Sequence, residues 1–191
     1  MQTRPTLLLA ALLLTGSAFA ASPAEPVQRD VNQQQRIEQG LKSGQLNTRE
    51  AARLEGEETH VEKMEANALK DGHLSKQEKA RINRAENRVS GDISREKHDG
   101  QLGNPNSASS QRVQADVQRN INQQQRIEQG IQNGTLNNRE IARTERAEAR
   151  DTRAEARAGR DGHVSAREQA RVQHDENVAS RKIYRKKHNQ G

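Results

Sequence analysis

Polar and apolar residues alternate along this chain with the period of an amphipathic helix. In the stretch 27–42, Val27, Val31, Gln34, Ile37 and Leu41 fall on one side of a helix that turns by about 100° per residue. Gln34 lies in the middle of that stripe, so we expect a buried amide that bonds across a pair of helices. The same period predicts six helices, at 27–42, 47–70, 75–98, 113–132, 137–160 and 165–188.

A turn motif that occurs four times separates these helices. In each copy a glycine is followed two residues later by an aliphatic residue, then by Asn or Ser, and three residues later by Glu. The glycine suits the left-handed end of a helix, and the Asn or Ser with its Glu is typical of a capping box. The copies begin at Ser43, Asp71, Asn133 and Asp161. Short turns join antiparallel neighbours, so the predicted fold class is all-α.

The second half of the chain repeats the first at an offset of 90 residues. The phrase Asn-Gln-Gln-Gln-Arg-Ile-Glu-Gln-Gly at 32–40 recurs unchanged at 122–130, and 38 of the 72 aligned positions in 27–98 are identical. We therefore predict a tandem duplication of a three-helix unit, with repeat 1 at 27–98, a linker at 99–111 and repeat 2 at 112–191. In this interpretation Gly40 and Gly130 ease the chain into the turn that follows.

The first twenty residues have the pattern of a secretory signal peptide. Arg4 precedes the apolar run 7–14, and the sequence Ala-Phe-Ala at 18–20 fits the rule for cleavage before Ala21. Residues 21–26 are predicted to be a flexible lead-in. No later stretch is apolar enough for a transmembrane helix. We expect an exported protein, located in the periplasm or alternatively outside the cell.

The apolar content is low for a globular protein. Hydrophobic residues make up 30% of the chain, and cysteine is absent, so no disulfide reinforces the core. Tyr184 is the only aromatic residue after position 20. We expect a thin core that self-association into a homo-oligomer, or a bound ligand, would strengthen.

Charge is divided unequally between the two halves. Residues 21–110 carry 14 Lys and Arg against 15 Asp and Glu, a net charge of −1, whereas residues 111–191 carry 17 against 11, a net charge of +6. Arginines recur in steps of four and three along 137–160, which places them on one stripe of that helix. A second basic run closes the last helix. The candidate anion-binding residues are Arg139, Arg143, Arg146, Arg150, Arg153, Arg157, Arg160, Arg181, Lys182, Arg185, Lys186 and Lys187.

These basic residues have two possible uses. A row of guanidinium groups can bind a polyanion such as nucleic acid, an acidic polysaccharide or lipid head groups. The alternative is a solvated face that keeps a long charged helix soluble. The near absence of aromatic residues argues against sequence-specific binding of single strands, since stacking on bases needs them.

Two Asp-Gly-His turns resemble the second half of an EF-hand calcium loop. The matching residues are Asp71, His73, Ser75, Glu78, Asp161, His163, Ser165 and Glu168. An EF-hand also needs oxygen ligands at its first and third positions, where Leu69 and Arg157 stand in the two loops. The prediction is therefore a pair of capped joints with no cofactor, and a calcium or transition-metal site is the alternative.

No catalytic motif is found in the sequence. There is no cysteine nucleophile, no Gly-x-Ser-x-Gly and no phosphate-binding loop. The many carboxylates are predicted to lie on charged helical surfaces, where nothing would tune them for acid–base chemistry. We therefore expect a protein that is not an enzyme.

The phrases at 32–40 and 71–78, together with Ser-Arg-Lys-Ile-Tyr-Arg-Lys-Lys-His-Asn at 180–189, resemble a group of small exported proteobacterial proteins of unknown function. The resemblance covers nearly all of the chain after the signal peptide and implies no activity and no site. The expected function is a binding or interaction module with a basic ridge. The alternatives are a divalent-metal-responsive module and an envelope-stress or chaperone-like helical protein.

Overall fold

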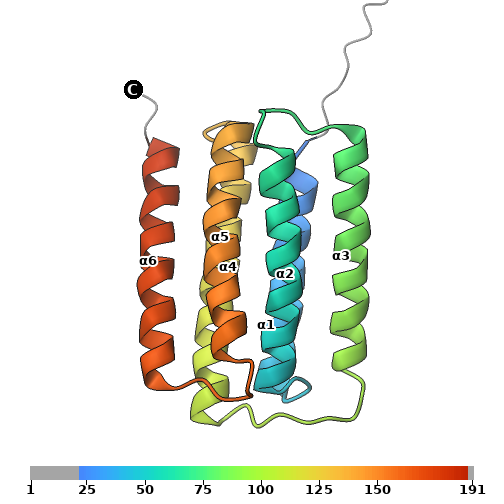
Figure 1. The fold of residues 1–191 in the computed structure, drawn as a ribbon, viewed down its shortest axis with the longest axis vertical. Helices are drawn as coiled ribbons and strands as arrows, with labels where there is room; N and C mark the ends of the chain where they lie inside the picture. Colours follow the sequence, from blue (N-terminus) through green and yellow to red (C-terminus); the bar gives the residue numbers. More distant parts are fainter. Residues whose placement is uncertain (1–21, 189–191) are drawn as a thin grey trace, which may run out of the picture.

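The computed structural model describes residues 22–188, and within them the chain forms six α-helices and no strand (Figure 1). The all-α prediction is therefore confirmed, whereas the predicted signal peptide lies outside the described residues. The helices are α1 (Ala24–Ser43), α2 (Thr48–Ala68), α3 (Lys76–Glu96), α4 (Ala108–Gln132), α5 (Asn138–Ala158) and α6 (Ala166–His188).

Two helices begin earlier than the periodicity predicts. α1 starts at Ala24, inside the predicted lead-in, because Pro26 lies in the first turn, where a helix needs no N–H from it. α4 starts at Ala108, inside the predicted linker. The Ser107 hydroxyl accepts a hydrogen bond from the Ser110 N–H at 3.1 Å and so caps this helix.

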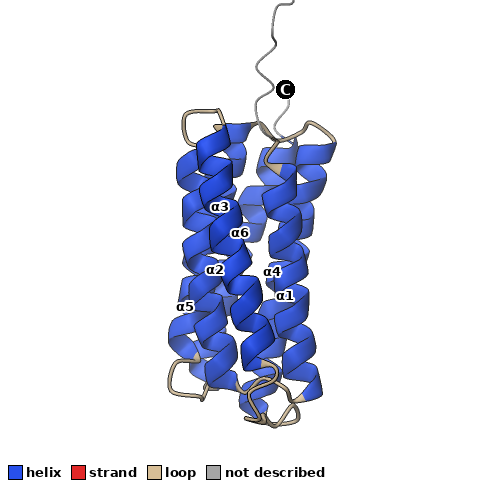
Figure 2. Ribbon diagram, turned by 90° about the vertical axis from the view of Figure 1, so that its right-hand side faces the viewer, coloured by secondary structure: helices blue, strands red, loops and turns tan. Residues whose placement is uncertain are grey.

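The four helices α1, α2, α4 and α5 form the centre of one bundle, and α3 and α6 lie at its opposite edges (Figure 1). The axes of all six helices are roughly aligned with one another, and consecutive helices run in opposite directions (Figure 2). α2 packs along α5, and α1 packs along α4. α3 covers α1 and α2, while α6 covers α4 and α5. The two halves of the chain therefore share a single interior.

Small residues bring α2 and α5 close together. A Cβ added to Gly159, just after α5, would lie only 2.7 Å from the Cβ of Ala52 on α2. Across the same contact the Thr152 hydroxyl donates to Glu62 Oε1 at 3.0 Å. A polar bond therefore joins the two repeats within their shared interior.

Equivalent residues of the two repeats make reciprocal contacts across this interface. The Arg49 guanidinium donates to the Asp161 carbonyl oxygen at 3.1 Å, and Arg139 donates to the Asp71 carbonyl oxygen at 3.3 Å. Each Asp-Gly-His turn is thus held by the first turn of the opposite repeat's middle helix.

The four predicted turns and their caps are confirmed. Gly44, Gly72, Gly134 and Gly162 have φ values of +76°, +95°, +67° and +88°, a conformation that favours glycine. The capping boxes that follow them pair Asn47 with Glu50, Ser75 with Glu78, Asn137 with Glu140, and Ser165 with Glu168.

The role predicted for Gly40 and Gly130 is wrong. Neither has a positive φ, and both lie within their helices rather than at the turn. A Cβ on Gly40 would lie 2.6 Å from the Leu46 side chain, and a Cβ on Gly130 would lie 2.5 Å from that of Leu136. The glycines are required because the leucine that follows each turn packs directly on the helix.

The interior contains the predicted aliphatic residues and also the predicted amide. Gln34 Nε2 donates to Glu55 Oε2 at 3.1 Å, joining α1 to α2, and both side chains are 1% exposed.

Leu102 and Tyr184 are the only large hydrophobic residues exposed in the part of the chain that the structure describes. No helix between residues 22 and 188 combines the length and the apolar character needed to cross a bilayer.

Candidate functional site

Two regions of the molecule carry concentrated charge. The first, here named the arginine face, consists of Arg139, Arg143, Arg146, Arg150, Arg153, Arg157 and Arg160, all of which are exposed. Every exposed residue within α5 is an arginine. Within residues 22–188, none of the seven forms an ion pair with a carboxylate. Their charge is therefore available to a partner.

The second predicted basic run adjoins this face through α6. Arg181, Lys182 and Arg185 are exposed, while Lys186 and Lys187 are partly exposed. Lys186 Nζ lies 3.9 Å from Glu140 Oε1.

Arg150 and Lys182 are the point at which the two basic sets meet. They line one cavity of about 210 Å³ between α5 and α6. The carboxylates of Asp151 and Asp175 line it too, so it is a mixed rather than a purely basic cavity.

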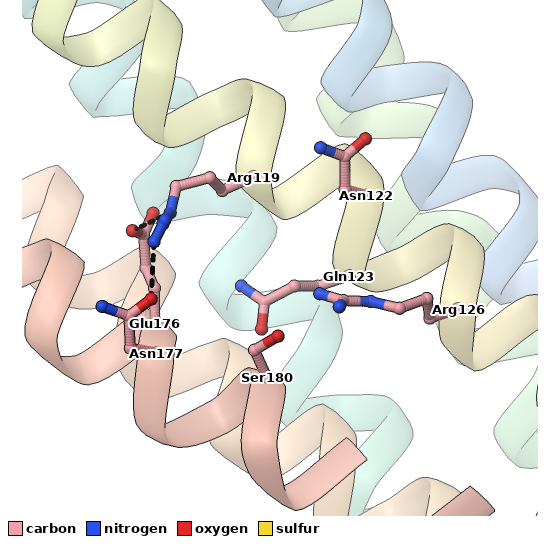
Figure 3. Close-up of a pocket in the computed structure, with 7 residues that line it drawn as sticks. All are labelled: Arg119, Asn122, Gln123, Arg126, Glu176, Asn177 and Ser180. Atoms are coloured by element: carbon pink, nitrogen blue, oxygen red, sulfur yellow. Dashed lines mark hydrogen bonds and ion pairs between the residues drawn. The ribbon is translucent and has the colours of Figure 1, made fainter. Parts of the chain in front are cut away.

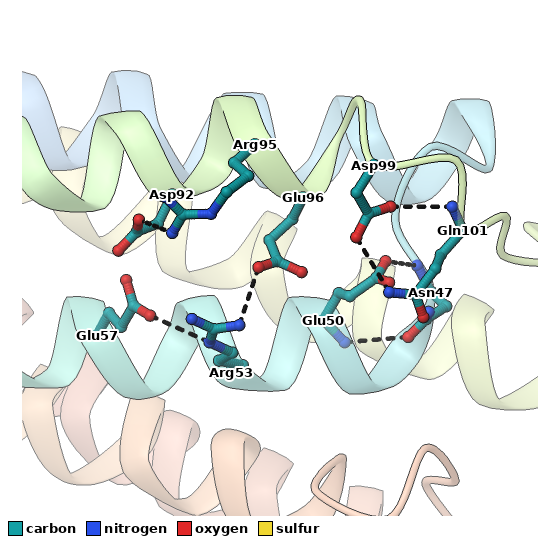
Figure 4. A network of polar contacts seen from close by, with 9 residues as sticks. All are labelled: Asn47, Glu50, Arg53, Glu57, Asp92, Arg95, Glu96, Asp99 and Gln101. Carbon is teal, nitrogen blue, oxygen red and sulfur yellow. Dashed lines mark hydrogen bonds and ion pairs between the residues drawn. The ribbon is translucent and has the colours of Figure 1, made fainter.

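The exposed side of α2, the counterpart of α5, has fewer arginines, and one of them is in ion pairs. Arg53 pairs with Glu57 at 3.4 Å and with Glu96 at 2.9 Å (Figure 4). His60 and Asn67 stand where α5 has Arg150 and Arg157. The continuous row of exposed guanidinium groups is therefore a property of α5 and not of α2.

The Asp-Gly-His turns use their carboxylates within the chain. Asp71 Oδ1 accepts the His73 N–H at 2.9 Å, and Asp161 Oδ1 accepts the His163 N–H at the same distance. Both histidines are exposed. The carboxylates of Glu78 and Glu168 each accept the N–H and the hydroxyl of the serine three residues earlier, Ser75 and Ser165. These groups build the capped joints.

The second charged region, here named the acidic interior, overturns the prediction that the carboxylates lie on the surface. Besides Glu50, which caps α2, twelve carboxylates contributed by all six helices are at most 6% exposed. They are Asp30, Glu55, Glu58, Glu62, Glu65, Glu86, Asp116, Glu145, Glu148, Asp151, Glu155 and Glu176. α5 therefore presents arginine to solvent and carboxylates to the core.

Few groups compensate the acidic interior. Arg29 Nε lies 2.6 Å from Glu86 Oε2, and Arg119 Nε lies 2.6 Å from Glu176 Oε2. Amide donors bond three more carboxylates: Gln34 to Glu55 at 3.1 Å, Gln124 to Glu145 at 3.3 Å, and Asn120 to Glu155 at 2.7 Å. Two guanidinium groups against twelve carboxylates leave a large excess of potential negative charge.

Burial raises the pKa of every carboxyl group in this region. The loss of hydration raises the pKa of Glu55, Glu86, Asp116, Glu145 and Asp151 to about 7, and that of Glu176 to about 8. For Asp30, Glu58, Glu62, Glu65, Glu148 and Glu155, burial and then the neighbouring carboxylates raise the pKa well above the ordinary value. The interior can therefore hold protons or cations near neutral pH.

Two groups of three carboxylates in the described chain are close enough to share a cation. One is Asp30, Glu65 and Glu86, from α1, α2 and α3. The other is Glu50, Glu96 and Asp99, but its members already have partners within the chain (Figure 4). Glu50 caps α2, Glu96 binds Arg53, and Asp99 accepts the Gln101 N–H at 2.9 Å.

A cavity of about 230 Å³ between α4 and α6 has Glu176, a member of the acidic interior, in its lining. Figure 3 shows the Arg119 guanidinium over Glu176 and Asn177, with Gln123 facing Ser180. Arg119 Nη2 donates to Asn177 Oδ1 at 2.7 Å. The paired Arg119 and Glu176 thus lie together in the lining of this cavity.

The acidic interior left one signal in the sequence. Four of its glutamates in repeat 1 have an identical partner 90 residues later, at 55/145, 58/148, 65/155 and 86/176. By contrast, Gly56, His60 and Asn67 on the exposed side of α2 are all replaced by arginine at the equivalent positions of α5. Identity alone does not indicate burial, because the exposed pairs Arg49/Arg139 and Arg53/Arg143 are identical too, so the signal is the identical glutamates on the opposite face.

The chain matches no protein-family model, no curated protein and no solved structure at a significant level.

Proposed function

We propose that the protein is a non-enzymatic binding module that takes a linear polyanion on its arginine face. The observation that carries the proposal is that every exposed residue of α5 is an arginine, and that none of these arginines forms an ion pair with a carboxylate of the described chain. At about 1.5 Å rise per residue, the stripe from Arg139 to Arg160 extends over about 30 Å. A flexible chain of sulfates, carboxylates or phosphates can follow such a stripe, and each guanidinium can bind two oxygens of one anionic group.

The surroundings of the arginine face support a partner bound through charge rather than through bases. The basic run on α6 extends it, because Arg150 and Lys182 line one cavity. Tyr184 is the only exposed aromatic residue in the described chain, so stacking on bases contributes little. An acidic polysaccharide is the partner class that these groups fit best.

The proposal also includes a duplication of a three-helix unit and export of the protein. The equivalent contacts made 90 residues apart favour a duplicated three-helix unit. The sequence at 1–20 favours export to the periplasm. Fractionation of cells followed by N-terminal sequencing tests export, and a mature protein that begins at Ala21 is the expected result.

Binding of fluorescent heparin, measured by anisotropy at increasing salt, tests the arginine face. The test variant is Arg146→Gln/Arg150→Gln/Arg153→Gln. The matched control is Arg81→Gln/Arg84→Gln/Arg88→Gln on α3, which removes the same charge from three exposed arginines at similar helical spacing. We expect the α5 variant to weaken binding at least about tenfold and to flatten the salt dependence, with the control near wild type.

An equal loss of heparin affinity in both triple variants would refute the arginine face as the binding site. It would show that binding depends only on the net charge of the protein. Duplex DNA and vesicles with anionic lipid, assayed in the same way, separate the partner classes. Tightest binding to either would reject the polysaccharide as the preferred partner.

A further inference from the structure

Asp30, Glu65 and Glu86 meet inside the first repeat without enough positive charge between them. Their side chains are 1%, 1% and 0% exposed, and carboxylate oxygens of the three lie within 4.8 Å of one another. Arg29 provides the cation paired with them, at 2.6 Å from Glu86. Three carboxylates and one guanidinium leave a formal charge of −2 when all are ionised.

The oxygens of this trio lack donors. Neither oxygen of Asp30 and neither oxygen of Glu65 accepts a hydrogen bond from an N–H or hydroxyl group in the described chain. The two carboxyls contact each other, and this contact is a hydrogen bond only if one of them carries a proton. A buried carboxylate without a donor is costly, so the trio requires a proton or a cation.

The second repeat contains a natural comparison. Its equivalent residues are Asn120, Glu155 and Glu176, with Arg119 at 2.6 Å from Glu176. Asn120 Nδ2 donates to Glu155 Oε2 at 2.7 Å. One amide in place of one carboxylate thus gives Glu155 a hydrogen-bond donor and removes one negative charge. The first repeat has Asp30 at that position and no such donor.

We propose that Asp30, Glu65 and Glu86 bind one divalent cation of the hard class, such as Ca²⁺ or Mn²⁺, within the first repeat. Three observations support this site: the spacing of the oxygens, the formal charge and the identity of the ligands. Oxygen ligands of one such cation lie about 2.1–2.6 Å from it, so two of them are at most about 5 Å apart. One divalent ion would cancel the charge of −2.

The ligand set also indicates which metals the site would prefer. All three ligands are carboxylates, which suit Ca²⁺, Mg²⁺ and Mn²⁺ rather than zinc or copper. Glu62 and Glu58, one and two turns before Glu65 on α2, are buried, and repulsion from Asp30 contributes to the raised pKa of both. They are the candidates for additional oxygen ligands, since Ca²⁺ takes six to eight.

Calorimetric titration of the metal-stripped protein at pH 7.5 with Ca²⁺ and with Mn²⁺ tests this site, and Mn²⁺ resonance spectra count the bound ions. The expected result is one ion per chain. Asp30→Asn reproduces the arrangement of the second repeat, so it should fold, and it should weaken binding at least about tenfold. Asn120→Asp should add a second ion.

The control variant is Asp71→Asn/Asp161→Asn, which changes the exposed turns and should leave binding unchanged. Absence of saturable binding to the wild-type protein at millimolar ion overturns the proposal. So does binding that Asp30→Asn leaves intact, or that the turn variant abolishes. A metal-free protein whose melting temperature rises with Asp30→Asn but which binds no ion would show that the trio holds a proton instead.

Discussion

Acidification should stabilise this protein, and the contribution of one buried glutamate, Glu55, to the free energy of unfolding can be worked out from its pKa. Burial raises the pKa of Glu55 from its ordinary value of 4.5 to about 7. Between these two values the folded state keeps a proton that the unfolded state releases, so stability is highest below about pH 4.5 and falls as the pH rises to about 7. A shift of about 2.5 pKa units corresponds to about 3 kcal/mol lost for this one group above pH 7.

Glu55→Gln isolates this effect because the amide cannot ionise. Its carbonyl oxygen can still accept the hydrogen bond from Gln34 Nε2, which now spans 3.1 Å. At pH 8 the variant should be more stable than wild type by about 3 kcal/mol, or about 6–12 °C in melting temperature for a chain of this size. At pH 4.5 the two proteins should agree within about 1 kcal/mol.

Thermal unfolding followed by circular dichroism, in a chelator that removes metal ions, measures both values. Glu145→Gln in the second repeat should behave alike, since burial raises the pKa of Glu145 to about 7 and Gln124 donates to it. Glu128→Gln on α4, which is partly exposed, is the control. The reasoning would be refuted if Glu55→Gln were less stable than wild type at pH 8. It would also be refuted if the variant changed the melting temperature by the same amount at pH 8 and at pH 4.5.

Three further changes probe the packing, the caps and the ion pairs. Gly40→Ala should cost about 1–3 kcal/mol, because its Cβ would lie 2.6 Å from the Leu46 side chain, and an unchanged melting temperature would contradict that contact. Ser75→Ala should lower stability by about 1 kcal/mol at any pH between 5 and 8, measured by urea unfolding, because it removes the capping box of α3. Arg29→Gln should cost about 3 kcal/mol at pH 8 and much less at pH 5, where Glu86, whose pKa burial raises to about 7, is protonated; equal losses at the two values would exclude this ion pair as the cause.

The helices could be predicted because their signals are local. A glycine that requires positive φ, such as Gly72, and a capping box three residues later act within one turn of chain. The buried amide of Gln34 followed from its place among aliphatic residues. The starts of α1 and α4 could not be predicted in this way, because Pro26 and Ser107 permit a helix there without any apolar period.

The acidic interior could not be predicted from periodicity. α5 has charged residues on both sides, arginine on one and glutamate with alanine on the other, so the pattern fixes two faces without showing which is buried. Packing against α2 decides it. The trio of Asp30, Glu65 and Glu86 comes from three helices, and only their assembly brings oxygens from such distant positions within 4.8 Å.

The covalent link between the two halves makes the contrast between Asp30 and Asn120 possible. If two identical single-repeat chains assembled through the same contacts of α2 with α5 and of α1 with α4, any substitution would appear on both sides at once. In one continuous chain each side mutates alone. The interior of one half and the surface of the other can then change separately, as Asp30 differs from Asn120 and Arg150 differs from His60 here.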